Sequence, residues 1–231
     1  MGIDLSLGEW LLACALGGLV GLDAVSWPQA MWSRPIVAGT LGGVLFGAPA
    51  EGCLVGACLE LVLSRHAPFG GARHAETGPA ALTAGAACGL AQSGSAIDVP
   101  AAVACGWAIG WLGTRSVTVL RRVTARLATG PGGGWGSAAT LARRHRLAML
   151  LDGVRAGLLV ASLLVPSALL VRFLSTHPAA GPGALGASAL VAIGLAGMGG
   201  VAARALGARR RHWPAFAAGG ILGAVLAAVL A

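Results

Sequence analysis

Apolar runs separated by short polar breaks make up most of this chain. The first run extends from Leu5 to Leu22 and is interrupted only by the polar residues Ser6 and Glu9. At about 1.5 Å per residue it forms a helix of roughly 27 Å, which is long enough to cross the hydrocarbon core of a bilayer. A break with two prolines follows, from Asp23 to Pro35, and predicts that the helix ends there.

The next three apolar runs are shorter or only weakly apolar. They are Ile36 to Gly47, Cys53 to Leu63 and Thr77 to Gln92, with a polar, glycine-rich segment from Arg65 to Glu76 before the last. Short paired segments that are broken by glycine and proline are typical of discontinuous helices beside a transport site. For residues 77–92 two interpretations stay open, a full span or a re-entrant segment buried in protein.

Four further apolar segments follow, and the turn from Ser175 to Gly183 divides them into two pairs. The segments are Ile97 to Leu112, Leu147 to Leu174, Ala184 to Ala203 and Ala215 to Leu230. Asp98 and Pro100 begin the first segment in helix-cap order. In the second segment Pro166 predicts a kink. Asp152 and Arg155 are three apart there, so they can pair on one helix face.

Two arginine-rich blocks indicate the membrane topology. The first, Arg115 to Arg146, has seven arginines, no acid, and a flexible GPGGGWG loop at residues 130–136; the second is Arg204 to His212. Two crossings separate the blocks, so both fall on one side, which the positive-inside rule makes cytoplasmic. Apolar residues recur at helical spacing in the first block and predict an amphipathic interfacial helix there. These residues are Val117, Leu120, Val123 and Leu127. Since topology accounts for the arginines, we expect no nucleic-acid partner.

The composition fits an integral membrane protein. Of the 231 residues 56% are hydrophobic and 10% are charged, whereas soluble domains have roughly 25% charged residues. The 38 glycines let helix backbones approach closely. We therefore predict one all-α transmembrane domain over residues 1–231, a polytopic helix bundle with broken, short and re-entrant helices. Its parts are a site-bearing half (1–114), the basic cytoplasmic segment (115–146) and C-terminal helices (147–231).

Charged and amide side chains are concentrated in the apolar stretch from Gly21 to Glu76. Such groups are costly in lipid and mark functional sites by default. The same stretch has a motif of recurring residue types. It reads Gly21, Leu22, Asp23, then Gln29, Ser33 to Gly39, Gly43, Gly47, Pro49, Gly52, Gly56, Leu59 and Glu60, and then Pro68, Gly70 and Glu76.

On these residues the stretch resembles enzyme IIC, the membrane-channel subunit in the mannose/fructose/sorbose class of the bacterial sugar phosphotransferase system. The resemblance implies a multi-pass inner-membrane protein that pairs with an enzyme IID subunit of homologous fold in an oligomer. It implies import of a hexose, which soluble IIA and IIB proteins phosphorylate. Catalysis would then belong to those soluble partners, so we expect no catalytic residue, cofactor or metal site in this chain.

A sugar site needs carboxylates, amides and guanidinium groups that bind hydroxyls. Our candidates for binding the sugar are Asp23, Gln29, Glu60 and Glu76, followed by Ser33 and Arg34. Structural roles stay open for several of them. Glu60 can pair with Arg34 or Arg65, Asp23 can cap a helix, and Gln29 can satisfy backbone groups freed by the adjacent proline. His66 and His74 lack metal-ligand spacing, so we expect both to be solvated or part of a polar network.

Two other functions remain as alternatives. The chain departs from the family motif at Ala48, Ala57, Cys58 and Arg73 to Ala75. These departures motivate a second hypothesis, a non-transporting scaffold or sensor that recruits soluble phosphotransferase proteins through the basic segment. A third hypothesis is an unrelated small-solute permease, which would have no IID partner.

Overall fold

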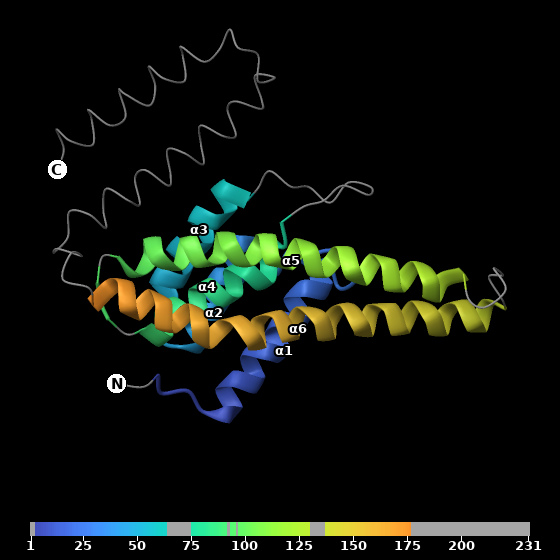
Figure 1. Ribbon diagram of the computed structural model, residues 1–231, viewed down its shortest axis with the longest axis horizontal. Helices are drawn as coiled ribbons and strands as arrows, with labels where there is room; N and C mark the ends of the chain where they lie inside the picture. The colour runs from blue at the N-terminus through green and yellow to red at the C-terminus, as the bar shows by residue number, and fades with distance from the viewer. Residues whose placement is uncertain (1–2, 64–74, 92, 96, 130–136, 177–231) are drawn as a thin grey trace, which may run out of the picture.

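The chain is all-helical in the part that the computed structural model describes, residues 3–63, 75–91, 93–95, 97–129 and 137–176. The helices are α1 (Leu7–Asp23), α2 (Pro35–Leu45), α3 (Pro49–Leu63), α4 (Thr77–Ala91), α5 (Asp98–Thr129) and α6 (Ala138–Thr176) (Figure 1). The all-α prediction is thus confirmed. Our predictions for His66, His74, the loop at 130–136 and residues 184–230 lie outside the described residues.

Helix α1 begins with a capping box. The Glu9 backbone N–H donates to Ser6 Oγ at 3.2 Å, and the Ser6 N–H donates to Glu9 Oε2 at 2.9 Å. The two polar residues of the first apolar run therefore satisfy backbone groups that a helix start leaves unpaired. Farther along, Trp10 Nε1 donates to the Ala161 carbonyl at 3.2 Å and so ties α1 to α6.

Helices α2 and α3 form a hairpin in which glycine faces glycine. A Cβ at Gly39 would lie 2.7 Å from the Gly52 carbonyl oxygen, and a Cβ at Gly52 would lie 2.8 Å from Gly43 Cα. On its other side α2 contacts α4, where a Cβ at Gly42 would lie 2.8 Å from the Ala86 nitrogen. Any larger residue would force these backbones apart, which is the close packing that the glycine ladder predicts.

Helix α4 is the centre of the structure. Every residue after Thr77 is buried, and α4 contacts each of the other five described helices. The helix consists mainly of alanine, glycine and other small residues, so its neighbours can surround it closely. Of the two interpretations of residues 77–92, the structure favours a segment buried in protein.

Helices α5 and α6 lie antiparallel and extend together beyond the other helices (Figure 1). At 32 and 39 residues they are about 48 and 58 Å long. We call the extension, residues 115–129 and 138–149, the arm. Within it Arg144 Nη1 donates to the Ala128 carbonyl at 2.9 Å. Residues 115–129 are helical, as their periodicity predicts, but they continue α5 rather than form a separate helix.

The end of the structure away from the arm is held by Asp98. This residue begins α5 and is buried, and its carboxylate accepts hydrogen bonds from the Ser93 and Ser175 hydroxyls and, at 3.1 Å, from the Ser95 N–H. The predicted helix start at Asp98 is confirmed. The same carboxylate connects the α4–α5 turn to the end of α6.

One described helix, α6, is both long enough and apolar enough to cross a membrane, and α2 is a shorter apolar helix. Helix α6 continues through Pro166 without interruption. It also begins nine residues before the predicted Leu147, inside the basic segment.

Candidate functional site

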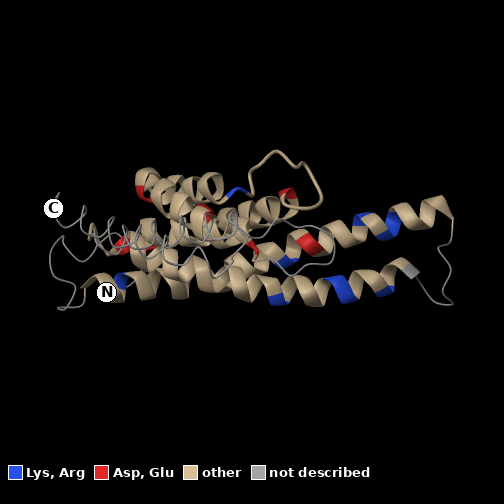
Figure 2. Ribbon diagram, turned by 90° about the horizontal axis from the view of Figure 1, so that it is seen from above, with Lys and Arg blue, Asp and Glu red and all other residues tan. Residues whose placement is uncertain are grey.

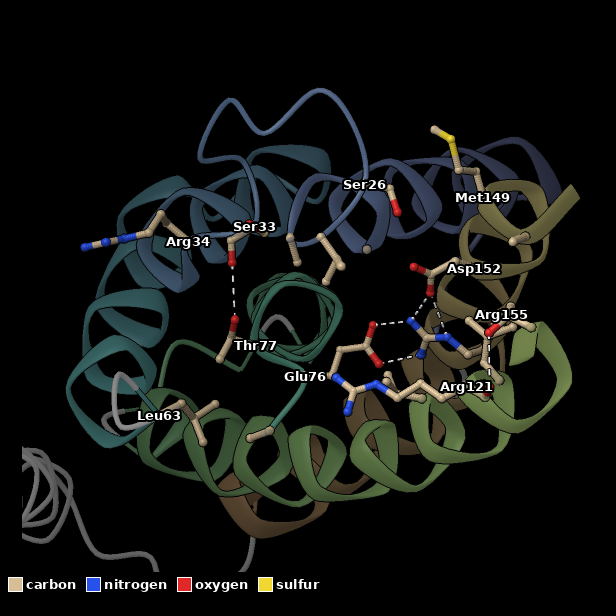
Figure 3. A pocket seen from close by; sticks show the side chains of 18 of the residues that line it. Ser26, Ser33, Arg34, Leu63, Glu76, Thr77, Arg121, Met149, Asp152 and Arg155 are labelled. Carbon is tan, nitrogen blue, oxygen red and sulfur yellow. Dashed lines mark hydrogen bonds and ion pairs between the residues drawn. The ribbon is translucent and has the colours of Figure 1, made fainter. Parts of the chain in front are cut away.

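A cavity of about 530 Å³ lies where the start of α4 meets the end of α1 and the base of the arm (Figure 3). Its wall is formed by the α1–α2 loop, the end of α3, the start of α4, and facing turns of α5 and α6. The polar and charged side chains that line it are Ser26, Ser33, Arg34, Glu60, Glu76, Thr77, Arg121, Thr124, His145, Asp152 and Arg155. The cavity thus joins residues from both halves of the described chain.

A buried charge network forms one wall of the cavity, centred on Arg155. The guanidinium binds the Glu76 carboxylate with two hydrogen bonds, of which Nη2 to Oε1 measures 2.6 Å. It also donates to Asp152 Oδ1 from Nη2 at 2.8 Å and from Nε at 3.1 Å. Ser116 Oγ of α5 accepts from Nη1 at 2.9 Å. The side chains of the three charged residues are only 8–15% exposed, so α4, α5 and α6 meet in a charged cluster shielded from solvent.

Backbone contacts fix the position of Glu76 in this network. Its N–H donates to the Gly110 carbonyl of α5 at 3.1 Å. One turn farther along α5, a Cβ at Gly113 would lie 2.7 Å from Glu76 Cβ, so a larger residue there would displace the glutamate. Glycine at position 113 therefore lets α5 approach close enough for Arg155 to reach Glu76.

The network combines two carboxylates with one guanidinium, so carboxylate oxygens remain in excess. Among the described residues Asp152 Oδ2 receives no hydrogen bond, whereas Oδ1 receives two. Figure 3 shows the Asp152 side chain at the cavity wall between Arg155 and the α1–α2 loop. A hydroxyl-bearing ligand in the cavity therefore meets a carboxylate oxygen with free acceptor capacity.

The second wall carries an ion pair between Arg34 and Glu60. Glu60 Oε2 also accepts from the Ile36 N–H at 3.1 Å and so links the end of α3 to the first turn of α2. The structure thus shows the Arg34 pairing that the sequence left open for Glu60. Because the Arg34 side chain is 59% exposed, this pair contributes at most about 1 kcal/mol to stability, and its members can rearrange around a ligand.

Asp23 holds the α1–α2 loop, residues 24–34, in place. Its Oδ1 accepts from the Ala30 N–H at 2.6 Å, and its Oδ2 accepts from the Ser33 N–H at 2.8 Å. Gln29 and Met31 in this loop have φ angles of 61° and 66°, which are unfavourable for residues other than glycine. The buried carboxylate offsets this cost by satisfying two amides of the folded loop.

Of the six predicted sugar contacts, the structure brings four together at the cavity: Ser33, Arg34, Glu60 and Glu76. The other two do not line it. Asp23 faces the loop amides, and Gln29 is exposed with its Nε2 donating to the Val25 carbonyl at 3.2 Å. Asp23 still acts on the cavity indirectly, because it positions Ser33, whose carbonyl accepts from Thr77 Oγ1 at 3.4 Å. Sugar binding by each of the six residues stays a prediction.

A family model described as "PTS system sorbose-specific IIC component" matches residues 7–230. The chain belongs to this family. The resemblance read from residues 21–76 is therefore confirmed, and it extends over nearly the whole chain. A search of curated proteins finds no match.

Membership in the IIC family assigns the chain to the membrane-embedded part of the sugar phosphotransferase system. It is a sugar-transport subunit, and its family implies a sugar substrate and further components of the same system. Among the described residues of this IIC chain, the cavity is a place where polar side chains line a space of the size of a small ligand.

Four ionisable residues of the cavity were not among the predicted site residues of this IIC chain: Arg121, His145, Asp152 and Arg155. The pairing of Asp152 with Arg155 on one helix face was predicted and is confirmed. Arg155 also contacts Glu76, which lies 79 positions away in the sequence, and this contact had no local signal. The usable signal was the presence of three charged residues, Asp152, Arg155 and Arg172, in the apolar run that became part of α6.

The role of Asp23 can be tested by hydrogen exchange. We expect Asp23→Ala to accelerate exchange at the Ala30 and Ser33 amides, because both lose their acceptor. Each lost hydrogen bond corresponds to about 1 kcal/mol, and thus to exchange that is about fivefold faster. Mass spectrometry of peptides from the loop measures the rate. The control is Asp4→Ala, which removes a charged residue that lies outside the helices. Equal exchange rates at the loop amides in both variants would contradict the role given to Asp23.

Proposed function

We propose that this chain is a multi-pass subunit of the bacterial inner membrane that carries a hexose into the cell, coupled to phosphorylation of the hexose by soluble IIA and IIB proteins. The observation that carries the proposal is the cavity, which collects carboxylates, guanidinium groups and hydroxyls inside a helical bundle of a sugar-transport family. An enzyme IID subunit completes the membrane complex in this proposal.

The size and chemistry of the cavity support a sugar as its ligand. Its volume of about 530 Å³ falls within the range of about 300–1,000 Å³ that is usual for small-molecule sites. Each sugar hydroxyl both donates and accepts hydrogen bonds. The carboxylates of Glu76, Asp152 and Glu60 supply acceptors, and the guanidinium groups of Arg34 and Arg155 supply donors.

In this proposal the two walls have different roles. Glu76 and Asp152 bind sugar hydroxyls from a rigid wall, because Arg155 holds both carboxylates in place. Arg34 and Glu60 bind from a more exposed wall whose ion pair can open. Asp23 contributes by shaping the loop that carries Ser33.

The arginines of the arm support an orientation in which the cavity is on the cytoplasmic side of the membrane. Figure 2 shows arginines along the part of α5 and α6 that extends beyond the bundle. By the positive-inside rule this part lies in the cytoplasm. The cavity is at the base of the arm, so in this conformation it is on the cytoplasmic side of the bundle, where soluble partners have access. The short helices α2 and α3 and the buried α4 then lie within the bundle rather than crossing separately.

Sugar uptake tests the proposal. Cells that lack their own mannose-class transporter receive the complete complex, with either the wild-type chain or the Glu60→Ala variant, and take up radiolabelled mannose, fructose or sorbose. We expect uptake of at least one sugar with the wild type and a loss of at least about tenfold with Glu60→Ala, because a charged hydrogen-bonding partner is removed. Membrane fractions confirm insertion.

Glu51→Ala is the matched control for this experiment. Glu51 lies on the same helix, α3, but is exposed and does not line the cavity. We expect it to transport like the wild type. Normal uptake by Glu60→Ala would contradict the role of Glu60, and no uptake of any sugar by the wild-type complex would contradict the transport function itself.

The scaffold alternative keeps one supporting observation, the exposed arginines of the arm, which can attract an acidic protein. Co-purification of soluble IIA or IIB proteins with the chain, without binding of any of the three sugars, would favour this alternative over transport.

A further inference from the structure

The α1–α2 loop exposes a patch of large apolar side chains. Trp27, Met31 and Trp32 are 62%, 69% and 43% exposed. Residues 24–33 include no charged side chain. A patch of this kind, with two indoles and a thioether close together in the sequence, marks a surface that a partner or a membrane covers.

Hydrogen bonds fix the shape of this loop. The Asp23 carboxylate accepts from the Ala30 and Ser33 amides, and the Leu22 carbonyl accepts from the Ser26 N–H at 2.8 Å. Ser26 and Ser33 also line the cavity. The loop therefore has two sides, one that forms part of the cavity wall and one that presents the apolar patch to the surroundings.

The contacts of α1 show where the loop lies along α6. A Cβ at Gly17 would lie 2.9 Å from Val160 Cβ, whereas a Cβ at Gly153 would lie 3.1 Å from the Leu22 side chain. As α1 proceeds toward its end, its contacts on α6 thus move toward the arm. The loop that follows α1 continues in this direction, to the α6 residues before Gly153.

That part of α6 is the boundary between its polar and apolar segments. Met149 of α6 lines the same cavity as Ser26 of the loop (Figure 3). Arg146, the last arginine of the arm, lies three residues before Met149, and the apolar run begins at Leu147. Arginines at the end of an apolar helix extend their charged groups into the headgroup region of a bilayer. The loop is therefore at the height where headgroups give way to hydrocarbon.

The surface on the other side of the loop is apolar. Helix α2 runs beside α4 away from the cavity, since a Cβ at Gly78 would lie 3.1 Å from Ser33 Cα and a Cβ at Gly89 would lie 2.8 Å from Phe46 Cβ. The exposed residues of α2 are all aliphatic: Ile36, Val37 and Val44. The exposed surface thus changes from arginines on the arm to indoles in the loop and aliphatic side chains on α2, which is the order of chemistry across one leaflet.

We propose that the α1–α2 loop anchors the chain in the bilayer interface on the arm side, with Trp27, Met31 and Trp32 inserted among phospholipids. An indole has an apolar body and one N–H donor, so it fits the boundary between hydrocarbon and hydrated headgroups. The cavity then lies at the level of the headgroups, with lipid against the outer side of its loop wall. This anchor goes beyond the proposed function, because it holds for any solute that the cavity binds.

Spin labels measure the depth of the loop in the complex, reconstituted into vesicles of phosphatidylethanolamine and phosphatidylglycerol. The five native cysteines are replaced by alanine, and Met31→Cys, Ala142→Cys or Leu158→Cys adds one thiol at an exposed position. Leu158 lies eleven residues, or roughly 16 Å, beyond Leu147 and thus near the centre of the hydrocarbon. Relaxation by oxygen and by a water-soluble nickel chelate reports the depth of each label. We expect the label at Met31→Cys within about 5–10 Å of the headgroup boundary, deeper than at Ala142→Cys and shallower than at Leu158→Cys.

Two results would overturn the anchor. A label at Met31→Cys that is as accessible to nickel as the label at Ala142→Cys would place the loop in water. A label there that is shielded from both oxygen and nickel would show that a protein subunit covers the loop instead of lipid. Aqueous labels at both Met31→Cys and Leu158→Cys would also contradict the membrane-spanning bundle of the proposed function.

Tryptophan fluorescence gives a second measurement that leaves the native cysteines in place. The wild type is compared with the double variant Trp27→Phe and Trp32→Phe in vesicles whose lipids carry bromine near the headgroup or near the chain end. The fluorescence that the double variant lacks should be quenched more strongly by the shallow bromines than by the deep ones. Absence of quenching of this fluorescence by either lipid would overturn the anchor.

Discussion

Replacing Arg155 by methionine is expected to lower the free energy of unfolding by about 3–5 kcal/mol. The substitution leaves the Glu76 and Asp152 carboxylates without their shared cation, and both side chains are at most 15% exposed. It also removes the link among α4, α5 and α6, because Ser116 loses its bond to the same guanidinium. The thermal unfolding midpoint of the purified protein in detergent measures the effect.

Two other substitutions separate the network from general effects of charge. Arg155→Lys keeps a positive charge but cannot form the paired hydrogen bonds to Glu76, so its midpoint should lie between those of the wild type and Arg155→Met. Arg143→Met removes an exposed arginine from the same helix and should unfold like the wild type. If Arg155→Met and Arg143→Met unfold at the same temperature, the network does not hold the three helices together.

Filling the cavity is expected to stop transport. Ala148 is a half-buried residue of α6 on the cavity wall, so the indole ring in Ala148→Trp occupies space that the sugar needs. We expect sugar uptake to fall at least about tenfold, because a ligand that loses its contacts in a filled site loses more than 1.4 kcal/mol of binding. Uptake of radiolabelled sugar by cells with equal amounts of inserted protein measures this.

Ala142→Trp is the matched control for that experiment. Ala142 lies on α6 as well, but it is exposed and does not line the cavity. The same indole there should leave uptake close to that of the wild type. Uptake that is unchanged by Ala148→Trp would place the sugar path elsewhere, and equal losses in both variants would point to a general effect of the added ring on the arm.

The sequence predicted the early helices well because their signals are local. The predicted run from Leu5 to Leu22 became α1 (Leu7–Asp23), and the run from Ile36 to Gly47 became α2 (Pro35–Leu45). Prolines, glycines and a capping box mark these boundaries directly. The starts and ends around the basic segment were predicted less well. There the predicted helix boundaries were set where the sequence changes from apolar to arginine-rich. Because no glycine or proline interrupts residues 114–129, α5 instead continues through the arginines.

The candidate site could be predicted only in part. Ser33, Arg34, Glu60 and Glu76 belong to one stretch of sequence and do meet at the cavity. The partner of Glu76 could not be found in this way, because Arg155 reaches it only after α6 packs against α4.

The role of Asp23 was equally hidden. It depends on a loop with positive φ angles at Gln29 and Met31, which nothing in their residue types indicates. Local chemistry thus identifies which groups are unusual, and tertiary packing decides which of them face each other.

Protection of a single cysteine by sugar tests the central claim, that the cavity at the base of the arm binds the transported sugar. The five native cysteines are replaced by alanine, and Ala148→Cys or Ala142→Cys is added as the only thiol. A methanethiosulfonate reagent then labels each thiol with and without the transported sugar. At a sugar concentration ten times the dissociation constant, we predict about tenfold slower labelling of Ala148→Cys and no change for Ala142→Cys. Labelling of Ala148→Cys at the same rate with and without a sugar that the protein transports would contradict the claim.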